Sequence, residues 1–151
     1  MPSSATVYFD TNVFILAYEG AGKTSAPARR LLAAVETGAI AAATSAVTLA
    51  ETLAGAFKAA DRDLADLYRT ILADGPGFTL QPIDLAVLER AALLRAAYDG
   101  LKLPDAIHLA TALCHGCTHL ATADRRLPVP DGLDRVLVEE AAVDLLLGSL
   151  P

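Results

Sequence analysis

Four acidic residues, far apart in the chain, occupy positions from which their carboxylates can meet. Asp10 and Asp124 each follow a short apolar segment of the strand type. Asp105 opens a predicted helix, and Glu51 lies about one and a half turns into another. Sites in open α/β sheets form beyond the carboxyl ends of the strands. We therefore expect one site at that edge of the sheet, built from Asp10, Glu51, Asp105 and Asp124.

Such a cluster of acids has a definite chemistry. Carboxylates held close together repel each other, so the cluster is stable only with a shared proton or a bound cation. Oxygen ligands without a cysteine and histidine set favour Mg²⁺ or Mn²⁺ over zinc. Bound Mg²⁺ can activate water and stabilise the charge that builds up on a phosphate during phosphodiester cleavage. The four acids therefore predict metal-dependent hydrolysis without a protein nucleophile.

Each acid taken alone also has a purely structural explanation. Asp10 can cap the helix that follows it, and Asp105 beside Pro104 is a normal helix start. Glu51 can be a solvated helix residue, and Asp124 can be a turn residue. The chemical interpretation depends on their combination.

The net charge of the chain bears on whether its substrate can be a nucleic acid. The formal charge is −6, with 18 acidic and 12 basic residues, and an acidic chain by itself argues against nucleic-acid binding. The objection weakens where cations neutralise converging acids. Arg125 and Arg126 either hold RNA phosphates or form a solvated turn. A local positive rim has six candidates, namely Arg29, Arg30, Arg62, Arg69, Arg125 and Arg126.

The composition indicates one globular domain, residues 1–151, since 54% of the residues are hydrophobic and no repeat or composition break divides the chain. The N-terminus lacks the pattern of a signal peptide. The longest uncharged stretch, residues 106–123, contains three histidines and a glycine, which does not fit a membrane span. We expect a soluble, cytoplasmic protein without membrane contact.

Strand and helix patterns alternate along the chain, which predicts an α/β fold with a mostly parallel sheet covered on both faces. We expect strands at residues 5–9, 39–44, 78–83, 119–122 and 135–138. Helices are expected at residues 11–19, 25–37, 46–59, 61–73, 84–100, 105–115 and 139–147, with Ser25, Ser45 and Asp84 as N-caps. In the helix 84–100 the apolar positions Leu85, Leu88, Ala92 and Leu93 recur at helical spacing.

Cysteine and histidine leave two questions open. Cys114 and Cys117 could form half a zinc site or a redox pair, but we interpret them as small apolar residues at a helix end. His108 lies one turn beyond Asp105, so it either faces the site or packs on the sheet. We predict packing.

Four segments, in this order, resemble the motifs of the PIN-domain nucleases. YFDTNVFI (8–15) is similar to the opening motif, and TSAVTLAE (44–51) to the second. KLPDAIHLATAL (102–113) is similar to the third. LATAD (120–124) resembles the fourth, with Ala123 where many members carry a polar residue. Each segment contains one of the four acids.

The resemblance implies a three-layer α/β/α fold, endoribonuclease activity dependent on Mg²⁺ or Mn²⁺, and the four acids as catalytic metal ligands. By the same match, Thr11, Asn12 and Ser45 support the site through hydrogen bonds. At this length the chain resembles the VapC-type toxins of bacterial or archaeal toxin–antitoxin pairs. That implies an RNA substrate, a homodimer, and a cognate antitoxin that inserts a segment into the active-site groove.

Three other functions fit parts of the pattern. A phosphatase of the haloacid dehalogenase type needs a second acid two positions after the first, where this chain has Asn12. A receiver domain needs a late lysine, and Lys23, Lys58 and Lys102 are all misplaced for it. A non-catalytic PIN scaffold that binds RNA or a protein partner remains the alternative to an enzyme.

Overall fold

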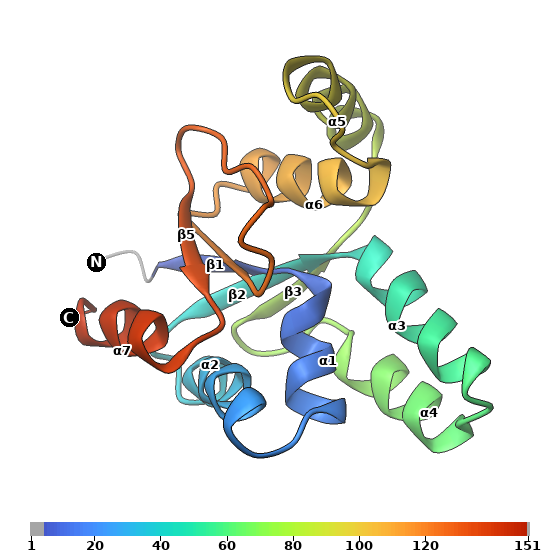
Figure 1. Ribbon diagram of the computed structural model, residues 1–151, viewed down its shortest axis with the longest axis vertical. Helices are drawn as coiled ribbons and strands as arrows, with labels where there is room; N and C mark the ends of the chain where they lie inside the picture. The colour runs from blue at the N-terminus through green and yellow to red at the C-terminus, as the bar shows by residue number, and fades with distance from the viewer. Residues whose placement is uncertain (1–4, 151) are drawn as a thin grey trace.

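A parallel five-stranded sheet forms the centre of the molecule in a computed structural model that describes residues 5–150. Residues 1–4 and 151 of the expected domain 1–151 lie outside the described part. The strand order is β3-β2-β1-β4-β5, so β1 lies in the middle (Figure 1). The strands are β1 (Thr6–Phe9), β2 (Ala41–Ser45), β3 (Phe78–Gln81), β4 (His119–Thr122) and β5 (Asp134–Leu137).

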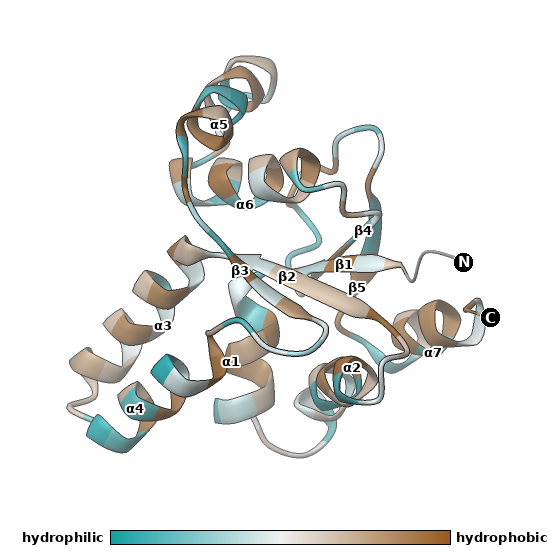
Figure 2. Cartoon of the chain, turned by 180° about the vertical axis from the view of Figure 1, so that it is seen from behind, coloured by the Kyte–Doolittle hydropathy of each residue, from teal (hydrophilic) through white to brown (hydrophobic). Residues whose placement is uncertain are grey.

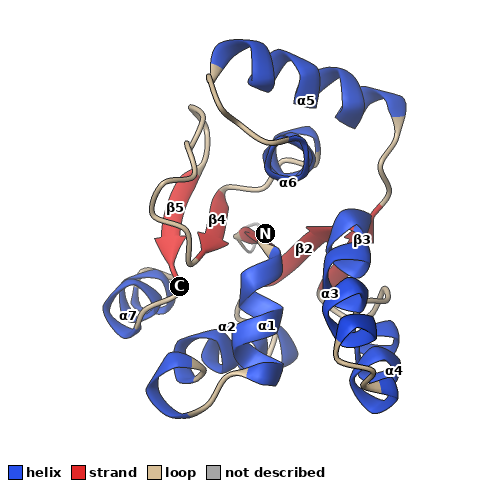
Figure 3. Cartoon of the chain, turned by 45° about the vertical axis from the view of Figure 1, so that its right-hand side comes forward, coloured by secondary structure: helices blue, strands red, loops and turns tan. Residues whose placement is uncertain are grey.

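Helices cover both faces of this sheet and give the expected three-layer α/β/α fold. Helices α5 and α6 lie on one face, with α5 on the outer side of α6 (Figures 1 and 3). The remaining helices pack on the other face. The helices are α1 (Thr11–Glu19), α2 (Ala26–Glu36), α3 (Ala46–Lys58), α4 (Arg62–Ile71), α5 (Leu85–Ala97), α6 (Leu103–Cys114) and α7 (Glu140–Gly148), with a 3₁₀ turn at Gly22–Thr24.

The middle strand β1 is buried on both sides, as parallel strands between helical layers are. Successive side chains of a strand point to opposite faces. Val7 and Phe9 join the core under α1, α2 and α7, whereas Tyr8 joins the core under α6. Tyr8 thereby places a hydroxyl group beneath α6.

The carboxyl ends of β1, β2 and β4 lie next to each other at one edge of the sheet. The backbone N–H of Asp10 donates to the carbonyl of Ala121 at 3.0 Å, which extends the β1–β4 pairing to the first acid. Helices α1 and α3 begin directly after β1 and β2, capped by Asp10 and Ser45. The first turns of two helices therefore lie beside the strand ends, as the sequence predicts.

One expectation about the helices is wrong in detail. Ser25 occupies the N-cap position of α2, but its side chain donates to the carbonyl of Gly22 and caps nothing. Helix α5 buries Val87 and Ala91, whereas Leu85 and Leu93 are 80% and 66% exposed. Helix α5 thus packs on α6 with a face that contains neither Leu85 nor Leu93.

The neighbouring helices α3 and α4 differ in hydropathy. Hydrophobic residues cover most of α3, whereas α4 alternates hydrophobic with strongly hydrophilic residues (Figure 2). Within residues 5–150, none of the helices has both the length and the apolar character that crossing a bilayer requires.

Candidate active site

Asp10 is the most firmly held of the four acids. It is 7% exposed. Its Oδ1 accepts from the backbone N–H of Thr11 at 2.8 Å. Its Oδ2 accepts from Thr122 Oγ1 at 2.8 Å and from Asn12 Nδ2 at 3.1 Å. These donors come from β4 and from the first turn of α1. Hydrogen bonds from two different elements therefore fix the orientation of the carboxylate.

Glu51 reaches the same place from α3. Its Oε1 accepts from Thr11 Oγ1 at 2.8 Å and lies 2.7 Å from His108 Nε2. The same ring nitrogen is 3.6 Å from Asp10 Oδ1, which brings the two carboxylates to one point. The hydrogen bond with His108 lowers the pKa of Glu51, with a smaller contribution from Thr11, so Glu51 is ionised at neutral pH.

Asp105 and Asp124 face a hollow beside the first pair. The hollow has a volume of about 430 Å³, and its walls also include Lys102 and Arg126. Asp124 Oδ1 accepts from the backbone N–H of Arg126 at 2.8 Å. Within residues 5–150, the Asp105 carboxylate accepts no hydrogen bond from any residue. Asp10 and Glu51 are therefore held by side-chain hydrogen bonds, whereas Asp105 and Asp124 line an open hollow that also contains basic residues.

The pKa of Asp105 is affected by all three other acids. Burial raises its pKa above the usual value, and the negative charges of Asp10, Asp124 and Glu51 raise it further, partly offset by His108. Like charges raise a pKa noticeably only when they lie near the group that titrates. The four acids predicted from the sequence thus form one electrostatic cluster at the carboxyl edge of the sheet.

The side chains as placed do not form a complete ligand cage. In the described part of the chain, no three histidine, cysteine or acidic side chains are arranged closely enough to hold a metal ion. The donor set nevertheless suits a hard divalent cation, because it consists of carboxylate oxygens. A cation would also relieve the repulsion that Asp105 experiences.

The sequence match decides the family. The model of the PIN domain matches residues 7–133. This chain belongs to the PIN-domain family. Comparison with the curated proteins gives no match.

Solved structures agree with that assignment. The PIN domain is similar to a chain of a toxin–antitoxin complex from Klebsiella pneumoniae, with 31% identity, a TM-score of 0.64, and coverage of 84% of this chain and 94% of the other. A sarcin–ricin-loop-cleaving VapC toxin from Mycobacterium tuberculosis shares the fold at 17% identity and a TM-score of 0.67, over 80% and 92% of the two chains. A DNA-bound VapBC complex from Salmonella typhimurium shares it at 17% identity and a TM-score of 0.67, over 89% and 98%.

The three predicted supporting residues of this PIN domain have different partners. Thr11 donates to Glu51, and Asn12 donates to Asp10 while its Oδ1 accepts from the backbone N–H of Ala123 at 3.0 Å. Among the described residues, Ser45 forms no hydrogen bond with any of the four acids. Its hydroxyl accepts from the backbone N–H of Val47 and so caps α3, the helix that carries Glu51.

The prediction that His108 packs on the sheet instead of facing the site is corrected by the structure. The ring is 1% exposed, and its Nδ1 does contact Tyr8 of the sheet, but its Nε2 reaches Glu51. Sequence reasoning also missed Thr122, although a threonine at the end of an apolar strand and beside Asp124 is a usable signal.

The six arginines do not form one rim. Arg30 pairs with Glu140 and Asp144 at 2.6 Å, and Arg125 pairs with Glu139. Arg126 is the one member of the set that lines the hollow with Asp105 and Asp124. The two adjacent arginines therefore have different surroundings.

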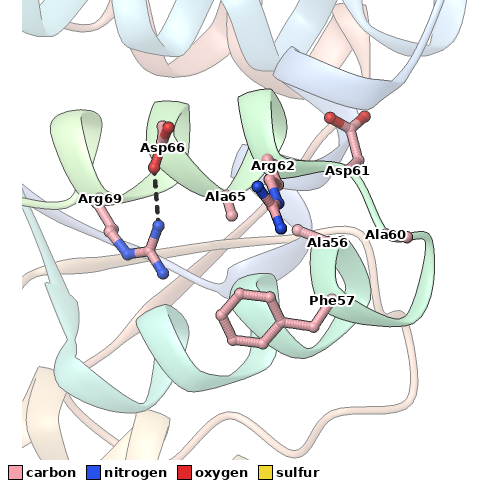
Figure 4. Close-up of a pocket in the computed structure, with 8 residues that line it drawn as sticks. All are labelled: Ala56, Phe57, Ala60, Asp61, Arg62, Ala65, Asp66 and Arg69. Atoms are coloured by element: carbon pink, nitrogen blue, oxygen red, sulfur yellow. Dashed lines mark hydrogen bonds and ion pairs between the residues drawn. The ribbon is translucent and has the colours of Figure 1, made fainter.

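A second cavity, of about 410 Å³, lies between α3 and α4 (Figure 4). Its two acids have structural partners. Asp61 caps α4 by accepting from the backbone N–H of Leu64, and Asp66 pairs with Arg69 at 2.8 Å. None of the four clustered acids lines this cavity, so the candidate site lies at the sheet edge.

Proposed function

We propose that this PIN domain is a divalent-cation-dependent endoribonuclease. The observation that carries the proposal is the convergence of four acids from distant segments of a PIN-family chain, with hydrogen bonds that orient two of them. The proposal includes all four acids as catalytic metal ligands, namely Asp10, Glu51, Asp105 and Asp124.

The bound cation, Mg²⁺ or Mn²⁺, would supply activated water and stabilise the charge that builds up on the phosphate. Asp10 and Glu51 orient one side of the site, because Thr11, Asn12 and Thr122 fix their oxygens. Asp105 and Asp124 provide the other side. Lys102 and Arg126, which line the hollow with Asp105 and Asp124, would supply positive charge for the phosphates of the RNA.

The biological role that we propose is that of a toxin that arrests growth by cutting RNA, with a cognate antitoxin as partner. The similarity to a chain of a toxin–antitoxin complex supports this role. A cytoplasmic location and a homodimer are part of the proposal. A dimer interface would give cover to the exposed Leu85 and Leu93 of α5.

The alternative to the enzyme is a PIN scaffold that binds RNA or a protein without cutting. Binding of Mn²⁺ that is abolished by Asp10→Asn would favour the enzyme, and absence of binding would favour the scaffold.

The experiment that tests the proposal maps new RNA 5′ ends after brief induced expression of wild type and of Asp10→Asn in parallel. We expect growth arrest and discrete ends with wild type alone. The same set of ends with both proteins would contradict a role for Asp10 in cleavage. No ends with either protein would favour the scaffold.

The different surroundings of Arg125 and Arg126 predict that substituting them has different effects on RNA binding. Arg126→Gln removes a positive charge beside Asp105 and Asp124, so we expect the KM for RNA to rise about fivefold and the salt dependence of binding to weaken by about one phosphate contact. Arg125→Gln serves as the matched control, because Arg125 pairs with Glu139. Equal effects in both variants, measured by RNA binding at several salt concentrations, would contradict the assignment.

A further inference from the structure

A chain of hydrogen bonds runs from the middle of the sheet to Glu51 through His108. Tyr8 Oη lies 2.6 Å from His108 Nδ1, and His108 Nε2 lies 2.7 Å from Glu51 Oε1. The three residues come from β1, α6 and α3. The proposed cleavage assigns no role to a histidine, so this buried ring needs another explanation.

The hydrogen-bond partners of Tyr8 Oη indicate where the hydrogens lie. The N–H of Ser45 donates to Tyr8 Oη at 3.0 Å, and a backbone N–H can only donate. Among the described residues, His108 Nδ1 is the one acceptor within hydrogen-bond distance of the Tyr8 hydroxyl, so a buried hydroxyl that keeps its hydrogen satisfied donates to it. A nitrogen that accepts a hydrogen bond carries no hydrogen, so the neutral ring carries its hydrogen on Nε2.

This tautomer matters for Glu51. The Nε2–H group donates to Oε1, the same oxygen that accepts from Thr11 Oγ1 at 2.8 Å. Glu51 is otherwise a half-exposed side chain with several rotatable bonds, whose ordering costs entropy. Two donors on Oε1 fix the carboxylate and leave Oε2 as the oxygen for a ligand.

We propose that His108 positions Glu51 for cation binding, and that Tyr8 sets the tautomer that allows it. The inference rests on the proposed function and deepens it: His108 acts through Glu51 and touches neither the RNA nor the reacting water. The other tautomer would present a lone pair to the carboxylate and repel it.

The tautomer is tested directly by NMR of protein labelled with ¹⁵N-histidine, without cations or RNA. We expect an unprotonated Nδ1 and a protonated Nε2 for His108, with its signals assigned by their loss in His108→Gln. In Tyr8→Phe the preference for this tautomer should weaken. A wild-type His108 that carries its hydrogen on Nδ1 would overturn the proposal.

The positioning role is tested by titration with Mn²⁺ alone, followed by electron paramagnetic resonance. His108→Leu should weaken Mn²⁺ binding about tenfold to a hundredfold, as changes next to a ligand do. His108→Gln should restore most of the affinity, because its amide group keeps an N–H near the position of Nε2. His119→Gln is the matched control, since His119 contacts Thr118 and lies at the far end of β4.

Wild-type Mn²⁺ affinity in folded His108→Leu would overturn the proposal. Where His108→Leu fails to fold, Tyr8→Phe decides instead, and an unchanged tautomer together with unchanged Mn²⁺ affinity would overturn it. Mn²⁺ binding without RNA cleavage by the wild type would count against the proposed function and leave the histidine result standing, so the two failures are distinguishable.

Discussion

Asp10→Asn is expected to lower the rate of RNA cleavage at least about 10³-fold while the protein stays folded. The change removes the negative charge that is most completely oriented by its neighbours. A cation that stabilises charge on a phosphate contributes several kcal/mol, and each 1.36 kcal/mol is about tenfold in rate. Cleavage of a labelled RNA under single-turnover conditions in Mn²⁺ measures the effect.

The stability of this variant needs a separate measurement. The new amide group replaces one oxygen that accepts from Thr122 and Asn12. We expect a loss of about 1 kcal/mol in the free energy of unfolding, because one buried acceptor is lost while Thr122 Oγ1 keeps the hydrogen bond that it accepts from the backbone N–H of Asp124.

Asp66→Asn is the matched control, because it changes the same residue type in the cavity between α3 and α4 (Figure 4) and removes one exposed ion pair. Cleavage by Asp66→Asn should equal that of wild type. Cleavage by folded Asp10→Asn within tenfold of wild type would refute the metal-ligand role.

Asp105→Asn is expected to have opposite effects on stability without and with a divalent cation. Burial and three neighbouring acids raise the pKa of Asp105 in the folded protein. Its ionisation at neutral pH therefore costs folding free energy, and the cost disappears as the pH falls through the raised pKa. Without cations, the variant should have a higher Tm than wild type at pH 7, and the difference should shrink at acidic pH.

With Mn²⁺ the order should reverse. Binding to the folded state alone stabilises a protein by about 2.7 kcal/mol at a ligand concentration of 100 times Kd, which is about 5 to 10 °C in Tm for a chain of this size. Wild type should gain this increment and Asp105→Asn should lose most of it. Thermal unfolding with EDTA and with Mn²⁺ measures the Tm of wild type and Asp105→Asn in both conditions, with Asp66→Asn as control. An equal Mn²⁺ increment in Asp105→Asn would exclude Asp105 as a ligand.

The sequence predicts elements well where the signal is local. The strand His119–Thr122 has the predicted bounds, and Ser45 and Asp84 cap helices as expected. Caps and strand ends depend on residues a few positions apart, so the neighbours in the chain determine them. Asp10 and Asp124 are found at the sheet edge for the same reason.

The sequence fails where the answer depends on a distant partner. Helix α5 is apolar on more than one side, so its periodicity does not decide whether Leu85 or Val87 is buried. His108 lies in a helix with buried residues on both sides of it, and its partner Tyr8 is 100 residues away. The sequence makes Arg30 a candidate for a positive rim. In the structure its guanidinium instead binds Glu140, which is 110 residues away.

The parallel sheet also determines when the site can form as the chain is synthesised. The middle strand β1 pairs with β4 on one side, and the hydrogen bond from Thr122 to Asp10 joins residues 112 positions apart. Contacts between residues so distant in sequence form slowly, because closing a long loop costs entropy before the contact is made. A nascent chain has one unpaired edge of β1, and an Asp10 without its Thr122 donor, until β4 has left the ribosome. In the proposed role, the four acids therefore come together only after the chain has been made and has left the ribosome as far as Asp124.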